Sequence, residues 1–450
     1  MQSERAVLVG LLLPGENRGG TRYDPLAELA GLASAAGATV VGRLIQKRGK
    51  PCGATYIGKG KTEELAEYAL QKEADVIIFD NDLTPSQIRE IEEVVKRKVL
   101  DRTELILDIF AARARTNEAR LQVELAQLEY TAPRLRGMWT HLERIAGAGG
   151  GGKVGAVGGI GTRGPGERQI EIDRRIVQKR VTFLKEQIRN IDRRKLRQVK
   201  AREEHFTVSL VGYTNAGKST LMNALTGAGT YVADKLFATL DTRTRRWELG
   251  DGQSVLLSDT VGFVRNLPHN LVASFQATLE EAIHSNLLLH VIDASDPDAP
   301  GQVDAVEAVL EELGCADIPT IAVLNKMDAV DDESGAHMLI PQLEDAVQIS
   351  AATGAGLDAL VEAVRSRIQD RFVRVLIESE VENGRLFAYV QRHGRLMSQT
   401  VEDGHLVLDL QLPAAEVQRV VDMGGRVRGH IDAHDSQDDE PLALEARRRG

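Results

Sequence analysis

The sequence predicts an α/β protein with several domains. Short apolar runs alternate with helical patterns in two separate stretches, 6–113 and 205–370, and this alternation is typical of parallel βαβ units. Two long helical patterns around a glycine-rich segment lie between these stretches, and a smaller pattern of strands and helices follows them. The length of 450 residues fits this organisation, because an ordinary domain takes roughly 150 residues.

These patterns divide the chain into five predicted segments. They are an N-terminal parallel α/β domain (1–113), a helical hairpin arm with a glycine-rich tip loop (114–204), a second α/β domain (205–370), a small α+β C-terminal domain (371–435) and a disordered tail (436–450). In the N-terminal domain we expect strands at 6–13, 39–45 and 76–79 and helices at 24–36, 62–72 and 85–97. In the second α/β domain we expect strands at 206–211, 255–257, 287–292, 321–324 and 346–349. In the C-terminal domain we expect a strand at 373–377, a helix at 384–392 and a hairpin through 402–404 into 405–410.

The composition excludes several classes of protein. An apolar fraction of 42% and a charged fraction of 27% are those of a globular chain. The absence of an apolar run of about 18 residues predicts no integral membrane segment. The only cysteines, Cys52 and Cys315, are too few for a disulfide framework or a cysteine-rich metal site. We therefore expect a cytoplasmic protein, either free or attached peripherally to a membrane.

The arm carries positive charge in a chain whose net charge is −10. Residues 168–202 hold 13 Lys and Arg against four Asp and Glu, and apolar residues recur every three or four positions in both predicted helices. The loop 147–166 holds 11 glycines, which let a backbone approach closely while the basic side chains neutralise phosphates. We predict RNA contacts at Arg163, Gly164, Arg168, Arg174, Arg175 and Lys179. A solvated coiled coil is the alternative interpretation.

A glycine-rich loop follows the predicted strand 206–211 and precedes a helical pattern, as a phosphate-binding loop requires. Its backbone N–H groups would surround the phosphates, Lys218 would reach the β- and γ-phosphates, and the Ser219 hydroxyl would bind Mg²⁺. The residues of this predicted site are Gly212, Tyr213, Thr214, Asn215, Ala216, Gly217, Lys218, Ser219 and Thr220.

Three further motifs follow in the order that this chemistry needs. Asp259, Thr260, Val261 and Gly262 end the next strand, where Asp259 can hold Mg²⁺ through water and the Gly262 N–H can contact the γ-phosphate. Asn325, Lys326, Met327 and Asp328 end a later strand, where the Asp328 carboxylate can accept two hydrogen bonds from guanine that adenine does not offer. Ser350, Ala351 and Ala352 can add backbone contacts to the guanine oxygen. The 205–370 domain is therefore predicted to be a P-loop GTPase domain.

The chain at this point resembles the HflX family of GTPases. The family's second nucleotide motif is matched by Phe237, Ala238, Thr239, Leu240 and Asp241, and its loop signature by residues 158–167. Its N-terminal motifs are matched by residues 56–61 and 101–110. The resemblance implies that Thr239 is a second Mg²⁺ ligand and that Lys218, Thr239 and Gly262 carry the catalysis.

The resemblance also implies a partner. Members of this family bind the large ribosomal subunit and its RNA, split stalled ribosomes after stress and prevent premature subunit joining. We expect the same of this chain, with GTP and GDP as ligands, no DNA specificity and a monomeric state.

Two residues bear on the rate of hydrolysis. Phe263 stands where many GTPases have a glutamine that orients water, so we expect slow intrinsic hydrolysis that a partner, the ribosome, stimulates. Asn215 resembles the asparagine with which some GTPases bind K⁺, which makes K⁺ a second candidate cofactor beside Mg²⁺.

Two other functions stay open at this stage. Gly58, Lys59, Gly60 and Lys61 are basic and glycine-rich, so an ATP-dependent RNA-remodelling enzyme is one alternative, although the tetrapeptide fits a simple turn better than a phosphate loop. A GTP-regulated protein-interaction switch that binds no RNA is the other.

Overall fold

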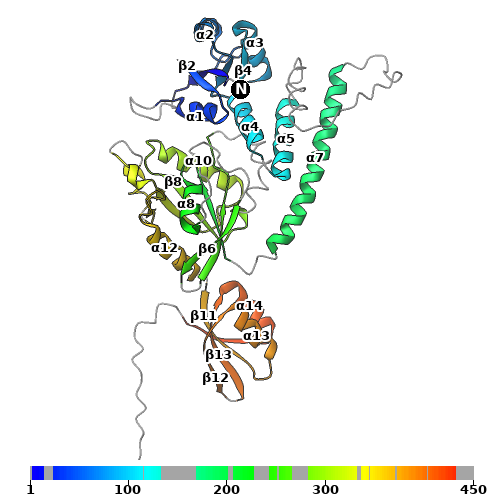
Figure 1. Ribbon diagram of the computed structural model, residues 1–450. Helices are drawn as coiled ribbons and strands as arrows, with labels where there is room; N and C mark the ends of the chain where they lie inside the picture. The colour runs from blue at the N-terminus through cyan, green and yellow to red at the C-terminus, as the bar shows by residue number, and fades with distance from the viewer. Residues whose placement is uncertain are drawn as a thin grey trace, which may run out of the picture. The chain divides into compact units, whose positions relative to one another are not determined.

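The computed structural model describes residues 3–14, 24–114, 116–132, 169–200, 206–227, 243–250, 253–265, 282–331, 336–343, 345–369, 372–402 and 404–431 (Figure 1). The chain forms two compact units, Met1–Leu357 and Asp358–Gly450. The predicted tail and the glycine-rich tip loop lie outside the described residues. The finer division into five segments stays a prediction.

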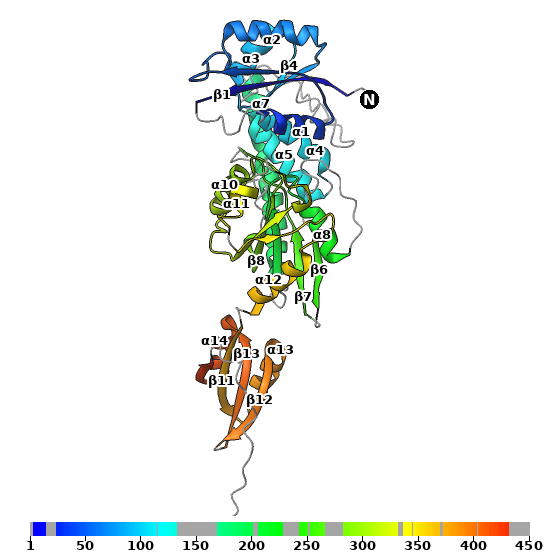
Figure 2. The same ribbon diagram turned by 90° about the vertical axis from the view of Figure 1, so that its left-hand side faces the viewer.

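The first sheet is parallel and has the strand order β2-β1-β3-β4. Alternate residues of β1 face opposite sides of this sheet. Ala6 and Leu8 pack with α1 and α4, whereas Val7 and Val9 pack with α2 and α3, and Figure 2 shows α2 and α1 on opposite faces. The elements are β1 (Arg5–Leu12), α1 (Ala27–Ala35), β2 (Thr39–Lys47), α2 (Lys59–Gln71), β3 (Val76–Phe79), α3 (Pro85–Val95), β4 (Lys98–Leu100) and α4 (Arg102–Arg113).

The helix starts in this domain follow from local sequence. Thr84 caps α3 in a capping box with Gln87, and Pro85 occupies its first turn. Gly58 precedes α2 with a φ of 89°, a backbone conformation that favours glycine. Lys59, Gly60 and Lys61 then form the first turn of α2, so the expected simple turn is confined to Gly58.

The arm consists of α5 (Asn117–Thr131) and α7 (Gln169–Lys200). The apolar seams pack against each other as the spacing predicts, since Leu125 and Leu128 of α5 form one buried cluster with Val177, Val181 and Leu184 of α7. Bidentate hydrogen bonds from Arg180 to Glu124 and an ion pair between Lys185 and Glu129 flank this cluster. The two helices therefore stabilise each other through a narrow apolar seam.

The second sheet has the order β10-β9-β8-β5-β7-β6, in which every neighbouring pair is parallel except β6 with β7. Its apolar strands β5 and β8 are almost fully buried, as expected for central strands of a parallel sheet. The elements are β5 (Thr207–Gly212), α8 (Lys218–Thr226), β6 (Arg243–Gly250), β7 (Gln253–Asp259), β8 (Leu287–Asp293), α10 (Ala299–Glu312), β9 (Thr320–Asn325), η2 (Met327–Ala329), α11 (Ala336–Leu339) and β10 (Val347–Gln348).

The second unit contains an antiparallel sheet of order β12-β13-β11-β14 with a βαββαβ element order. Its core combines apolar side chains of β11 and β13 with those of α13 and α14. The elements are α12 (Leu357–Gln369), β11 (Phe372–Glu380), α13 (Gly384–His393), β12 (Arg395–Glu402), β13 (His405–Pro413), α14 (Ala414–Asp422) and β14 (Arg426–Ile431). Within the described part of the chain, no helix is both long and apolar enough to cross a membrane.

Candidate nucleotide-binding site

The loop between β5 and α8 has the backbone of a phosphate cradle. Gly212 and Gly217 have φ values of 144° and 95°, and an added Cβ would collide with the Val291 carbonyl and the Asn325 amide, respectively. Asn215 also adopts a positive φ of 63°, a conformation that asparagine tolerates. The loop ends at Gly217, directly before α8, and the backbone N–H groups at the N-terminus of this helix can bind an anion.

Lys218 begins α8 and lies inside this loop with 6% of its surface exposed. Its ammonium donates hydrogen bonds to the carbonyls of Gly212 at 2.9 Å and Tyr213 at 2.7 Å. Burial lowers the pKa of Lys218 to about 8, while Asp259 opposes that shift. Phosphate oxygens would supply the negative charge that this buried ammonium needs.

A pair of oxygen donors suited to Mg²⁺ stands beside the lysine. The Ser219 hydroxyl donates to the Asp259 carboxylate at 2.7 Å, and Asp259 is 1% exposed at the end of β7. Hard oxygen ligands are those that Mg²⁺ prefers, and the ion commonly uses only one or two protein ligands together with phosphates and water. The pair therefore fits a nucleotide-bound Mg²⁺. No group of three or more His, Cys, Asp and Glu residues suited to a metal occurs among the described residues.

The segment after β7 lies against the phosphate loop. Thr214 donates from its backbone N–H to the Phe263 carbonyl at 2.8 Å, and the Phe263 N–H donates to the Gly212 carbonyl at 3.1 Å. An added Cβ on Gly262 would lie 2.8 Å from Thr214 Cα and 3.0 Å from Lys218 Nζ. This position requires glycine and brings the 262 backbone next to the lysine that would hold the phosphates.

Phe263 is 2% exposed and packs in an apolar cluster with Tyr213 and Val261. A buried phenyl ring offers no hydrogen bond to an attacking water. Thr260 is also buried and donates from its hydroxyl to the Leu210 carbonyl at 2.6 Å. These side chains fix the segment in place.

The base-recognition motif follows β9. The Asn325 amide donates to the Ala216 carbonyl at 2.8 Å and accepts from the Ala351 N–H at 2.9 Å, so it joins the two loops on either side. Lys326 pairs with Asp293 at 2.6 Å. Asp328, in contrast, is exposed, and its carboxylate is available to a guanine edge.

The loop after β10 completes this side of the site. Ser350 is 1% exposed, and its hydroxyl accepts from the Thr353 N–H at 3.1 Å. Ala351 is buried beside Asn325, whereas Ala352 is exposed. The structure thus brings together the phosphate loop, the Asp259 segment and both base-recognition loops, which lie far apart in sequence.

Part of the predicted site lies outside the described residues, namely Phe237, Ala238, Thr239, Leu240 and Asp241. Of the predicted RNA contacts, Arg163, Gly164 and Arg168 also lie outside them, and Arg174 lies within α7 without a described side chain. Arg175 and Lys179 are exposed on α7.

The sequence pattern missed two residues at the site, Glu28 and His290. The Tyr213 hydroxyl donates to the carboxylate of Glu28, which comes from α1 and is 185 residues away in sequence. His290 of β8 is also buried near Lys218, and burial lowers its pKa to about 4. Neither residue has a spacing signal that could reveal its place, since both depend on packing between distant elements.

Comparisons with known proteins agree with this site. Residues 23–111 match a family described as GTP-binding GTPase N-terminal, and residues 113–202 match the GTP-binding GTPase middle region. Residues 207–326 match the family described as 50S ribosome-binding GTPase. Together the three matches cover most of residues 23–326.

Individual relatives match most of the chain. It is 40% identical to the GTPase HflX of Escherichia coli over 93% of this chain and 95% of that protein. It is 42% identical to the GTPase HflX of Caldanaerobacter subterraneus over 89% of each chain, and 48% identical to that of Flavobacterium psychrophilum over 72% of this chain and 76% of that one. Because the chain is at least 40% identical to these relatives over most of its length, and its phosphate loop, Asp259 segment and base-recognition loops come together, it belongs to the HflX family of GTPases and hydrolyses GTP.

Proposed function

We propose that this GTPase binds the large ribosomal subunit, where it splits stalled ribosomes or prevents subunit joining during stress. The observation that supports the proposal is that one chain contains both a GTP site and a basic helical arm. The match to a family described as 50S ribosome-binding GTPase supports the choice of partner. We further propose that it acts in the cytoplasm, free or peripherally at a membrane.

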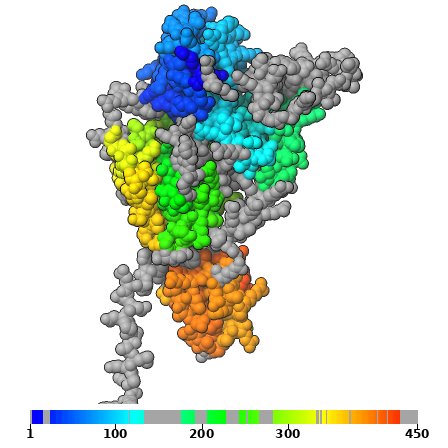
Figure 3. All heavy atoms as spheres, viewed as in Figure 1, coloured from blue at the N-terminus to red at the C-terminus, as the bar shows by residue number. Residues whose placement is uncertain are grey.

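The arm supplies the RNA-binding face in this proposal. Its seam buries Val177, Val181 and Leu184, while Arg175 and Lys179 are exposed. Figure 3 shows part of α7 at the surface. Exposed cations on a helix can neutralise RNA phosphates and release counterions, which gives affinity that falls with salt.

Hydrolysis would use a small set of residues. Ser219, Thr239 and, through water, Asp259 would hold Mg²⁺, which supplies charge neutralisation at the phosphates. Lys218 would bind the β- and γ-phosphates, and the Gly262 N–H would contact the γ-phosphate. Phe263 is buried and leaves the attacking water without a side-chain partner, so we propose slow turnover by the free protein and stimulation by the ribosome.

We also propose that K⁺ assists this reaction. Asn215 supports the proposal because its side chain is exposed at the edge of the phosphate loop. A monovalent cation there would offset negative charge that develops on the phosphates. Faster turnover in K⁺ than in Na⁺ buffers of equal ionic strength is expected, and equal rates would contradict the role of K⁺.

Binding and splitting can be tested together. The protein is mixed with intact ribosomes and a slowly hydrolysed GTP analogue, and subunit separation is followed by light scattering and sedimentation. We expect splitting, with the protein in the large-subunit fraction, and less of both with GDP. Intact ribosomes without bound protein would contradict the proposal, and a complex that survives ribonuclease would favour a protein-interaction switch.

A further inference from the structure

The Tyr213 side chain connects the phosphate loop to two other parts of the chain. Its hydroxyl oxygen accepts a hydrogen bond from the Arg265 N–H at 2.8 Å, just beyond the Gly262 segment. The same hydroxyl donates to the carboxylate of Glu28 on α1. Burial raises the pKa of Tyr213, and Glu28 raises it further, so the hydroxyl keeps its proton for this bond. One hydroxyl thus joins the phosphate loop, the segment after β7 and the N-terminal sheet.

Glu28 is held in turn by a buried cation. Arg102 at the start of α4 is 3% exposed and contacts Glu28 at 2.9 Å and Asp80 at 2.7 Å. Burial alone would lower the pKa of Arg102, but Glu28 and Asp80 raise it above its ordinary value. Burial raises the pKa of Asp80 although Arg102 opposes that shift. The guanidinium therefore stays charged and fixes the orientation of Glu28.

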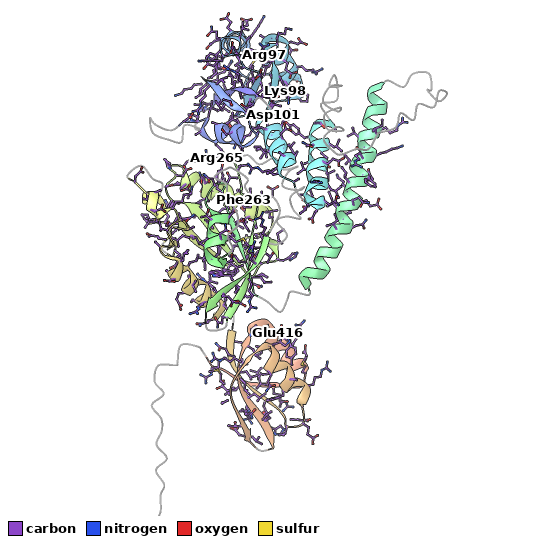
Figure 4. All side chains as sticks on the ribbon, in the orientation of Figure 1. Arg97, Lys98, Asp101, Phe263, Arg265 and Glu416 are labelled. Carbon is purple, nitrogen blue, oxygen red and sulfur yellow. The ribbon has the colours of Figure 1, made fainter. Side chains whose placement is uncertain are left out.

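Apolar packing surrounds these polar contacts. Leu29 of α1 and Ile106 of α4 belong to one buried cluster with Tyr213, Phe263 and Val264. Figure 4 labels Phe263 and Arg265 on the side of the nucleotide-binding domain nearest Asp101. A change in the position of one hydrogen-bonded side chain in this cluster shifts its neighbours, because a close-packed interior has low compressibility.

The same cluster reaches the arm. Asp101 precedes Arg102 and caps α4 by accepting from the Glu104 N–H at 2.9 Å. The hydroxyl of Tyr130, in the last turn of α5, donates to the Asp101 carboxylate. A continuous series of contacts therefore runs from the arm through Asp101, Arg102 and Glu28 to Tyr213.

We propose that Glu28 and Arg102 are positioning residues of the GTPase site that act through Tyr213, and that Tyr130 connects the arm to them. Tyr213 holds the Arg265 N–H, and backbone pairing holds Phe263 on the phosphate loop. Together these contacts keep the Gly262 backbone next to Lys218 before the nucleotide reacts. A preorganised donor lowers the barrier to hydrolysis without changing how tightly the substrate first binds.

The test of the positioning role uses the free full-length protein and no ribosome. Tyr213→Phe removes one hydroxyl and leaves the ring, and Glu28→Gln removes one charge. We expect kcat for GTP to fall by about 3- to 10-fold in each variant, which corresponds to about 0.6 to 1.4 kcal/mol in the barrier, with KM changed less than twofold. The double variant should lose no more kcat than the more impaired of the two single variants, because both changes act through one contact.

A matched control separates this role from a general loss of stability. Tyr389→Phe also removes a hydroxyl that donates to a glutamate, Glu416, but in the second unit. It should leave kcat unchanged, and all variants are compared at temperatures below their unfolding transitions. Unchanged or raised kcat in Tyr213→Phe and Glu28→Gln, or multiplicative losses in the double variant, would overturn the positioning role.

The link to the arm deepens the proposed ribosomal function and is tested with isolated large subunits. Tyr130→Phe should lose at least half of the stimulation that the parent shows, with each protein's stimulated rate expressed relative to its own basal rate. Full stimulation in Tyr130→Phe would overturn the link. A parent protein that large subunits do not stimulate would instead overturn the ribosomal proposal, while the subunit-free experiment would still decide the positioning role.

Discussion

The side-chain amide of Asn325 donates a hydrogen bond to the backbone carbonyl of Ala216, at 2.8 Å. Its carbonyl accepts from the Ala351 N–H at 2.9 Å. Asn325 is 2% exposed, so neither partner can turn to water if this side chain is lost. One buried amide therefore sets the distance between the loop that would bind phosphates and the loop that would bind the base.

Replacing this amide should weaken nucleotide binding. Each buried neutral hydrogen bond contributes about 1 kcal/mol, so we expect Asn325→Ala to bind both GTP and GDP about 10- to 100-fold more weakly. Isothermal titration measures this directly. Asn286→Ala is the matched control, because Asn286 accepts from the Thr207 N–H at 2.9 Å elsewhere in the same sheet. Equal affinity in the Asn325 variant and the parent would refute the bridging role.

The buried ammonium of Lys218 should make nucleotide affinity depend on pH. Its pKa of about 8 in the free protein means that the ammonium loses its proton above pH 8, whereas bound phosphates favour the charged form. GTP affinity should therefore fall by up to about tenfold per pH unit as pH rises above 8. Titrations from pH 7 to pH 10 test this, and Lys218→Met should show weak binding with no such slope.

The same shift predicts an opposite trend for the stability of the ligand-free protein. The pKa of Lys218 in the folded chain lies below the ordinary value of 10.5, so the unfolded chain binds more protons between pH 8 and 10.5. The contribution of Lys218 to the free energy of unfolding should therefore rise with pH in this window. Denaturant titrations measure the free energy of unfolding of the parent and of Lys218→Met at each pH. The difference between the two proteins should increase in favour of the parent from pH 8 to 10.5, and a constant difference would contradict the prediction.

His290 should contribute to acid sensitivity. Burial, together with the nearby charge of Lys218, lowers its pKa from an ordinary 6.5 to about 4, so the unfolded chain binds the extra proton between these values. The protein should lose about 3 kcal/mol of stability through this residue as pH falls from 6.5 to 4. His290→Gln should flatten that part of the stability profile. His284→Gln, at an exposed position, is the control that should keep the parental profile.

Charge reversal on the arm should weaken ribosome binding. The variant Arg174→Glu, Arg175→Glu and Lys179→Glu removes cations from α7. We expect lower affinity for large subunits and a smaller slope of log K against log salt, by roughly 0.7 to 0.9 per lost phosphate contact. A control reverses the same number of charges at Arg89, Lys96 and Arg367, which are exposed elsewhere. Affinity equal to the parent at every salt concentration would remove α7 from the RNA interface.

The strands that position the site could be predicted because their apolar runs are continuous. The structure confirms the strand expected at 76–79 and places β5, β8 and β9 within a residue or two of the expected bounds. The phosphate loop was also predictable, since its glycines and lysine have fixed spacing and each has a separate physical task.

Other elements have no comparable signal. The edge strand β6 carries four charged side chains among eight residues and pairs on one side only, and β4 is three residues long. The helix α14 and strand β14 were not predicted either. Helix α2 begins three residues earlier than expected, and β2 ends two residues later because its pairing with β1 continues through Lys47.

The contact between Glu28 and Tyr213 shows a different limit. The two residues are 185 positions apart and belong to different sheets. A periodicity or motif describes neighbours in sequence, whereas this contact depends on how α1 and the phosphate loop pack. The loop motif identifies Tyr213 as part of the phosphate loop but carries no signal for the partner of its hydroxyl.

We expect the large ribosomal subunit to complete the active site of a GTPase that is slow in its free form. The most direct test is multiple-turnover hydrolysis of GTP and ATP by the purified protein, alone and with isolated large ribosomal subunits. We expect slow turnover alone, at least a tenfold stimulation of GTP hydrolysis by large subunits, and no turnover of ATP. Equal GTP turnover with and without large subunits, or hydrolysis of ATP as well as GTP, would contradict it.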